Sequence, residues 1–181
     1  MTDFMPHSEG TPFFFAPFVS STLRVKPEWI DYNGHLNMAY YGVLFDTAVE
    51  QAFAAMGLGE DYVRERNGTT MTAEWHVVYR REVTLEDPVR VTLQLVDFDD
   101  KRLHIYMEMR HATESWLAAA AESMNLHVDM EARKVRPFPP DILATMAIMK
   151  AAHAALPRPE FLGRVMAVPR PLARAGQPGV Y

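Results

Sequence analysis

Alternating apolar and polar residues dominate the second half of the chain. Within residues 88–97, apolar side chains take every second position from Val89 onward, and three neighbouring segments repeat this spacing. Successive side chains of a strand point to opposite faces of a sheet, so the alternation predicts half-buried strands. The predicted strands cover residues 70–82, 88–97, 101–111 and 116–128, with a shorter one over 21–27.

The segment 116–128 is the least obvious of these strands because its middle is rich in alanine. Alanine has the highest helix propensity, so propensity alone favours a helix there. A helix would have to end in the strand-like run from Met124 to Val128. We therefore interpret the whole segment as a strand.

A three- and four-residue spacing of apolar side chains predicts a long helix from Met38 to about Met56. Asn37 is suited to cap its first turn, and Gly57 is suited to end it. A second helix is predicted over 141–156, after the break at Pro140. The stretch between the long helix and residue 70 is expected to be a loop.

The order of elements is strand, long helix and four strands, which indicates an α+β domain. Short connections predict one antiparallel five-stranded sheet wrapped around the long helix. An edge strand of such a sheet favours pairing with a second copy, so a homodimer or homotetramer is expected. The expected division is an N-terminal arm at 1–20, a domain at 21–140, and a C-terminal helix with a Pro/Arg-rich tail at 141–181.

Composition narrows the possible functions. The chain has 181 residues and a formal net charge of -5, and it lacks the basic stripe of a nucleic-acid-binding protein. It has no cysteine, which excludes disulfides and thiolate nucleophiles. No basic, apolar leader precedes the domain, and no stretch approaches the roughly 20 apolar residues of a membrane span. The expected location is the cytoplasm, without membrane attachment.

The loop before the long helix carries a recognisable motif. It reads W-I-D-Y-N-G-H-L-N-M-A-Y-Y from Trp29 to Tyr41 and continues to Phe45-Asp46. This run resembles the signature of the 4-hydroxybenzoyl-CoA thioesterase type of hotdog proteins, and the order of elements over 22–140 is similar too. The resemblance implies a hotdog fold, hydrolysis of a small acyl-CoA, and Asp31 as the catalytic carboxylate.

Further segments resemble one branch of that family, the betainyl-CoA thioesterases of carnitine degradation. They are Thr72–His76, Asp100–His104, His127–Asp129 and Ala152–Pro159. The branch implies betainyl-CoA as the substrate, with glycine betaine and CoA as products. Coenzyme A would belong to the substrate, so no separate cofactor is expected.

Thioester hydrolysis needs an activated water or a nucleophile, and stabilisation of the developing oxyanion. Asp31 can act as a general base or attack the thioester directly, and the sequence leaves both routes open. Backbone N–H groups from Gly34 to the helix start are candidates for polarising the carbonyl. His35 and Asn37 are expected either to orient Asp31 or to serve only the loop and the helix cap.

A quaternary ammonium group is recognised by aromatic faces and nearby negative charge. The candidate substrate-binding residues are Trp29, Tyr32, Met38, Tyr41, Asp46, Glu74, Trp75 and His76, with Tyr40, Tyr79 and Glu50 as further possibilities. Most aromatic residues on helices and strands serve packing, so core positions are the alternative for each. Lys101 and Arg102 are candidates for binding the CoA phosphates, with Arg80 and Arg81 as further cations.

Other hydrolase motifs are absent from the sequence, and three alternative functions stay open. The chain has no Gly-x-Ser-x-Gly elbow and no His-Glu-x-x-His pair, so a serine triad is not expected, and no metal site is indicated. A hotdog enoyl-CoA hydratase is an alternative, although its histidine would stand one position later than His35. A thioesterase for another short or aromatic acyl-CoA and a non-catalytic acyl-CoA-binding domain are the remaining alternatives.

Overall fold

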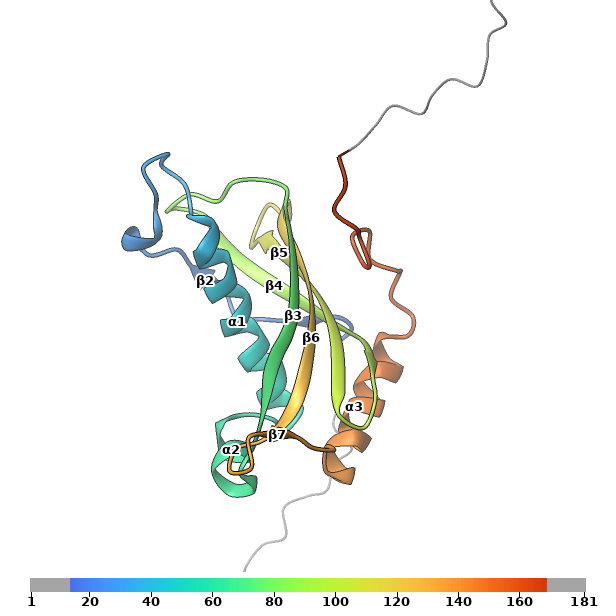
Figure 1. The fold of residues 1–181 in the computed structure, drawn as a ribbon. Helices are drawn as coiled ribbons and strands as arrows, with labels where there is room; N and C mark the ends of the chain where they lie inside the picture. Colours follow the sequence, from blue (N-terminus) through green and yellow to red (C-terminus); the bar gives the residue numbers. More distant parts are fainter. Residues whose placement is uncertain (1–13, 169–181) are drawn as a thin grey trace, which may run out of the picture.

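A computed structural model describes residues 14–168, and Figure 1 shows a long helix lying along one face of a twisted antiparallel sheet. The strands are β1 Phe18–Val19, β2 Leu23–Arg24, β3 Gly68–Tyr79, β4 Pro88–Phe98, β5 Arg102–His111, β6 Leu117–Asp129 and β7 Lys134–Val135. The helices are η1 Pro27–Trp29, which is a 3-10 turn, α1 Met38–Ala55, α2 Glu60–Arg66 and α3 Pro140–His153. This is the α+β hotdog architecture that the sequence predicts.

The sheet order is β1-β4-β5-β6-β3, with β2 also on β4 and β7 on β6. Its first strand differs from the prediction, because β1 and β2 replace the single strand expected at 21–27. The Oγ atom of Ser20 accepts the Val91 N–H at 3.0 Å, where a continuous strand would present a backbone carbonyl. The side chain thus interrupts the ladder, and β1 falls inside the segment expected to be an irregular arm.

The α1 helix forms where the spacing predicts it. The side chain of Asn37 accepts the Ala39 N–H at 3.0 Å, which satisfies one of the first unpaired donors of the helix. Gly57, with φ of 81°, follows the last turn in the left-handed conformation that ends many helices. The buried face of α1 consists of Tyr41, Leu44, Phe45, Ala48, Val49, Ala52 and Phe53, which pack on the sheet.

The alanine-rich segment is a strand, as predicted. Ala119 and Ala121 of β6 lie opposite Met109 and Met107 of β5, and all four of these side chains are buried. Pairing small with large side chains keeps the central strands close-packed beneath α1. Burial in the middle of the sheet therefore overrides the helix propensity of alanine.

Two short elements depart from the prediction. The segment expected to be a loop after α1 contains α2, a seven-residue helix that buries only Tyr62. One buried side chain is too few to produce a visible periodicity. The two-residue strand β7 pairs with the end of β6, in a stretch before the predicted break for which the sequence predicts no element.

The C-terminal part packs on the domain. Ile142, Met146 and Met149 of α3 join the same apolar core as α1 and β4. The chain then runs back beside the sheet (Figure 1), and Phe161 enters a second apolar cluster with Tyr106 and Ala120. We call residues 157–165 the strap. Residues 1–13 and 169–181 lie outside the described part, so most of the predicted arm and the end of the tail are not placed.

No helix within residues 14–168 combines the length and the apolar character needed to cross a membrane.

Candidate active site

The loop between η1 and α1 is closed by its own backbone. Ile30 and Leu36 form an isolated antiparallel bridge, and the Asp31 N–H donates to the His35 carbonyl at 3.0 Å. The Gly34 N–H donates to the Asp31 carbonyl at 3.0 Å, and Gly34 has φ of 86°. Glycine adopts this left-handed conformation without strain. The turn places Asp31 next to the start of α1.

The Asp31 carboxylate is half-buried and lines a groove of about 370 Å³. Its Oδ1 atom accepts the Asn33 N–H at 2.7 Å, whereas the amide nitrogen of Asn33 lies 3.5 Å from Oδ2. The second distance is longer than an ordinary hydrogen bond. One carboxylate oxygen is therefore held, and the other has acceptor capacity left for a water or a substrate.

The first turn of α1 lines the same groove through Asn37 and Met38. Within the described residues, no group accepts a hydrogen bond from the N–H of Met38. Such a free N–H at a helix start is a natural site for negative charge. The groove thus joins a carboxylate to a backbone donor, which is the pair of groups that thioester hydrolysis requires.

Two tyrosines form one wall of the groove. The rings of Tyr41 and Tyr79 meet edge to face at 5.1 Å, and the Tyr79 hydroxyl donates to the Met38 carbonyl at 3.3 Å. The Tyr41 oxygen accepts the Val83 N–H at 3.2 Å. Burial raises the pKa of both phenols, so both remain neutral near pH 7.

Three charged residues follow Tyr79 around the groove, namely Arg80, Arg81 and Glu82. Glu82 lies 3.8 Å from the Nε2 atom of His35, which ties His35 to this rim. The sequence indicated both arginines only as further cations and did not indicate Glu82. A charged run directly after a strand that carries groove aromatics was the signal for all three.

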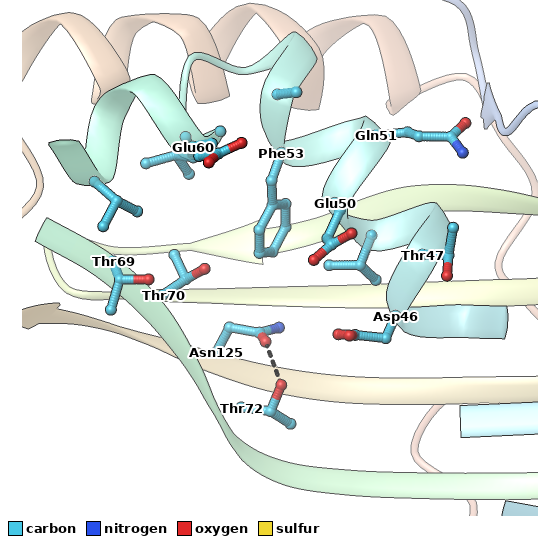
Figure 2. A pocket seen from close by; sticks show the side chains of 15 residues that line it. Asp46, Thr47, Glu50, Gln51, Phe53, Glu60, Thr69, Thr70, Thr72 and Asn125 are labelled. Carbon is cyan, nitrogen blue, oxygen red and sulfur yellow. Dashed lines mark hydrogen bonds between the residues drawn. The ribbon is translucent and has the colours of Figure 1, made fainter. Parts of the chain in front are cut away.

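A second, larger depression runs along α1 toward the edge of β3. It consists of cavities of about 700 Å³ and 380 Å³ that share Asp46, Val49, Thr72 and Asn125. Figure 2 shows Asp46 and Glu50 reaching from α1 toward β3. Ala39 also lines it, so the second groove begins one residue after Met38 of the first groove. We call it the acidic groove.

The floor of the acidic groove is polar. The Thr72 hydroxyl donates to Asn125 Oδ1 at 2.9 Å (Figure 2). The Asn125 Nδ2 atom in turn donates to the Ser123 oxygen at 2.9 Å. The sequence did not indicate Ser123 or Asn125 as site residues, and it indicated Thr72 only as part of the resembling segment Thr72–His76. The available signal was that Ser123, Asn125 and His127 place polar groups at every second position of a central strand, where the core is expected.

The predicted substrate residues on β3 separate into two faces. Trp75 lines the acidic groove and packs edge to face on Phe45 at 5.7 Å. Glu74 and His76 flank it in sequence and line a different cavity, of about 300 Å³, with His104 and Glu122. Adjacent residues of a strand cannot share a face, so one chain does not bring Glu74 and His76 together with Trp75.

Two other predicted aromatics stand outside both grooves. Trp29 stacks on Tyr40 with ring centres 5.3 Å apart and packs against the core. Tyr32 is 98% exposed at the tip of the loop. The alternative reading of Trp29 as a packing residue fits its surroundings.

Lys101 and Arg102 lie at the β4–β5 turn, beside α3, at the opposite end of the sheet from Asp31 (Figure 1). The guanidinium of Arg102 is bound by the Asp99 carboxylate at 2.6 Å. In an antiparallel meander alternate turns lie at opposite ends, which separates this turn from the loop before α1. Within one chain, the structure therefore does not bring these cations together with Asp31, and their role in binding the CoA phosphates stays a prediction.

The far edge of β3 has no strand beside it within the described residues, since β3 pairs only with β6. Met71, Trp75 and Tyr79 along this strand are each about 40% exposed or more. Met38 and Val43 of α1 are exposed as well. Both grooves thus open beside an apolar edge.

Among residues 14–168, no group of three or more histidine or acidic side chains is arranged to hold a metal ion.

Comparison with known proteins gives consistent matches. The sequence pattern of the thioesterase-like superfamily matches residues 25–146. The chain is 38% identical to a betainyl-CoA thioesterase of Pseudomonas aeruginosa over 80% of its length and 91% of that protein. It is 33% identical to an L-carnitine dehydrogenase/betainyl-CoA thioesterase of Rhizobium meliloti, of which it spans only 28%.

Solved structures agree with the sequence matches. A hypothetical protein of Staphylococcus aureus in complex with CoA has a TM-score of 0.78 and 29% identity, over 84% of this chain and 96% of that one. A putative thioesterase of Pseudomonas putida has a TM-score of 0.75 and 30% identity, over 86% and 99%. The chain therefore belongs to the thioesterase-like superfamily and is a hotdog acyl-CoA thioesterase.

Proposed function

We propose that this thioesterase hydrolyses betainyl-CoA to glycine betaine and CoA, with Asp31 as its catalytic carboxylate. Water adds to the thioester carbonyl carbon, the carbon–sulfur bond breaks, and the CoA sulfur leaves and takes up a proton. The observation that carries the proposal is the groove in which the half-free Asp31 carboxylate lies beside the unpaired Met38 N–H.

Each part of the groove has a chemical task in this reaction. The free oxygen of Asp31 removes the proton of the attacking water or attacks the carbonyl carbon itself. The Met38 N–H, reinforced by the helix dipole, stabilises the oxyanion. Loss of one such donor typically raises the barrier by about 3–4 kcal/mol. Asn37 then serves as the helix cap that fixes this donor.

The acidic groove supports a cationic acyl group. Asp46 and Glu50 supply negative charge, and Trp75 supplies an aromatic face. A trimethylammonium group cannot accept or donate hydrogen bonds, so charge and aromatic surface are the means of recognising it. The separation of charge between the acidic groove and the rim with Arg80 and Arg81 matches a substrate with a cationic acyl end and an anionic CoA end.

We also propose that the enzyme acts as a homodimer or a larger assembly of dimers. A second copy paired on the β3 edge would cover Met71, Trp75 and Tyr79 and would complete the backbone hydrogen bonds of that strand. The grooves open beside this edge, so the partner would form part of their walls. The cytoplasmic location expected from the sequence stays a prediction.

The test is thiol release from a panel of acyl-CoAs that includes betainyl-CoA and its neutral isostere 3,3-dimethylbutyryl-CoA. The two acyl groups have nearly the same shape and differ by one positive charge. We expect kcat/KM to favour betainyl-CoA by about tenfold or more, since desolvated cation–π contacts and a nearby carboxylate each contribute on the order of 1–2 kcal/mol. Asp46→Asn should reduce this preference, while Asp61→Asn in α2 should not.

Equal turnover of the two isosteres would contradict the substrate assignment and leave a thioesterase for another small acyl-CoA. Binding of CoA thioesters without thiol release would favour the non-catalytic alternative. Hydration of crotonyl-CoA without thiol release would favour the hydratase.

A further inference from the structure

The strap packs on the outer face of the sheet, away from α1. Phe161 is only 6% exposed and shares an apolar cluster with Tyr106 and Ala120. The Gly163 N–H donates to Glu122 Oε2 at 2.6 Å, and the other oxygen of Glu122 lies 2.7 Å from His104 Nε2. The strap is therefore held by a buried ring and by a backbone hydrogen bond to β6.

Arg80 links this strap to the Asp31 groove. Its backbone N–H donates to the Ala118 carbonyl at 2.8 Å, and the residue lines the groove. Its guanidinium carbon lies 5.3 Å from the centre of the Phe161 ring, within the range of a cation–π contact. A residue near the end of the described chain thus contacts the side chain of a residue that lines the substrate groove.

The charge of Arg80 is not neutralised. Among the described residues, no carboxylate forms an ion pair with Arg80 or with Arg81, whose guanidinium carbon lies 4.2 Å from the centre of the Trp116 ring. By contrast, Arg102, Arg110 and Arg136 are each bound by a carboxylate within 3 Å. A ring face orients a guanidinium and leaves its N–H donors available for an anion.

We propose that Phe161 is a positioning residue for substrate binding, which holds Arg80 at the groove so that it binds the phosphates of the CoA moiety. This inference rests on the proposed acyl-CoA hydrolysis and assigns the strap a role in binding the substrate of that reaction. Phe161 touches no substrate atom and acts only through Arg80. The strap therefore affects binding of the CoA phosphates and does not affect binding of the acyl group.

The test compares two substrates with the same acyl group, the CoA thioester and the pantetheine thioester, which lacks the phosphates and the adenosine that they carry. The measured quantity is the ratio of kcat/KM for the first to kcat/KM for the second. Phe161→Leu keeps an apolar side chain in the cluster but removes the ring face. Leu162→Ala is the matched control, because Leu162 packs on the same cluster but offers no ring face for the Arg80 guanidinium.

We expect Arg80→Met to lower the ratio about tenfold and Phe161→Leu to lower it about two- to fivefold, through KM for the CoA thioester with kcat retained. In the Arg80→Met background, Phe161→Leu should have no further effect, because both changes remove one interaction. Leu162→Ala should leave the ratio unchanged, and melting temperatures would show whether each variant folds.

An unchanged ratio in Arg80→Met overturns the proposal, whether or not the Phe161 variant folds. An effect of Phe161→Leu that persists undiminished in the Arg80→Met background also overturns it, because Phe161 would then act on the site by another route. If the wild-type protein releases no thiol from any acyl-CoA, the proposed function itself fails, and this result is distinct from the other two.

Discussion

Two polar clusters lie at opposite ends of the sheet, one at Asp31 and one at His127. His127 is fully buried, its Nε2 atom lies 2.8 Å from the Tyr62 hydroxyl, and its Nδ1 atom lies 3.0 Å from the carbonyl oxygens of Arg136 and Pro137. Both ring nitrogens have partners, with the proton on Nδ1. Asp31 is half-exposed, with one oxygen held and the other not.

This difference distinguishes polar groups that stabilise the fold from polar groups that can bind or react with a ligand. A buried group with all its partners stabilises one conformation and has no capacity for a ligand. A partly exposed group with an unused acceptor beside an unused donor can bind and react. Both clusters contain polar residues that the sequence analysis could single out. Only the Asp31 cluster, which keeps an unused hydrogen-bond acceptor and donor, lies in a groove.

The largest effect that would sharpen this comparison is expected from Asp31→Asn. The amide keeps the shape and can still accept the Asn33 N–H, but it is neither a base nor a nucleophile. We expect thiol release to fall by about 100-fold or more, with an unchanged melting temperature. Turnover close to that of the wild type would show that Asp31 takes no part in the reaction, and the two polar clusters would then not differ in function.

The reverse result is expected from His127→Leu. The change removes the donor that the Arg136 and Pro137 carbonyl oxygens share and the acceptor of the Tyr62 hydroxyl, at about 1–3 kcal/mol for each buried group that loses its partner. We expect the free energy of unfolding in urea to fall by about 2–4 kcal/mol, while kcat per folded molecule is retained. The partly exposed His76, changed to Gln, serves as the control. A stable but inactive His127→Leu protein would show that the cluster takes part in the reaction.

Gly34→Ala tests the loop itself. A Cβ atom at Gly34 would meet nothing within 4 Å, so the whole effect comes from φ of 86°. Left-handed backbone costs an L-residue about 1–2 kcal/mol, and relaxation of the turn would displace the Asp31 carboxylate. We expect a several-fold loss of kcat and a small loss of stability. Gly42→Ala, in a helix with open space, should be neutral or stabilising.

The smallest effect concerns pH. Burial lowers the pKa of His127 and of His153 below the ordinary value of 6.5. The unfolded chain therefore binds more protons than the folded chain as the pH falls through 6.5, and stability decreases. We expect the melting temperature to fall by a few degrees between pH 7.5 and 5.5, and to fall less in His127→Leu. A flat profile would show that neither imidazole is desolvated as its burial implies.

The sequence predicts the regular parts of the fold well because their signals are local. The spacing of Leu44, Ala48 and Ala52 defines α1, alternation defines three of the long strands, and the run from Met124 to Val128 indicates the fourth. The motif places Asp31 beside the helix start because the loop closes through contacts among residues 30–36. These features depend on neighbours in the chain, so a sequence can reveal them.

Features that depend on distant partners are harder to predict. The polar floor at Asn125 needs the pairing of β3 with β6, and a register shift between Thr72 and Glu74 fixes which β3 residues reach it. The split of β1 from β2 comes with a one-residue shift in their pairing with β4 and with the contact of the Ser20 hydroxyl to the Val91 N–H. The separation of Lys101 and Arg102 from Asp31 is an exception, because counting turns along the meander already places the two cations at the opposite end of the sheet.

Glu74 has one more consequence, since it stands in the middle of the uncovered edge of β3. Two copies aligned antiparallel about this position would bring their carboxylates side by side, and like charges directly opposite each other are destabilising. The edge of β3 that is proposed to pair with a second copy is therefore expected to disfavour this one alignment of the two strands.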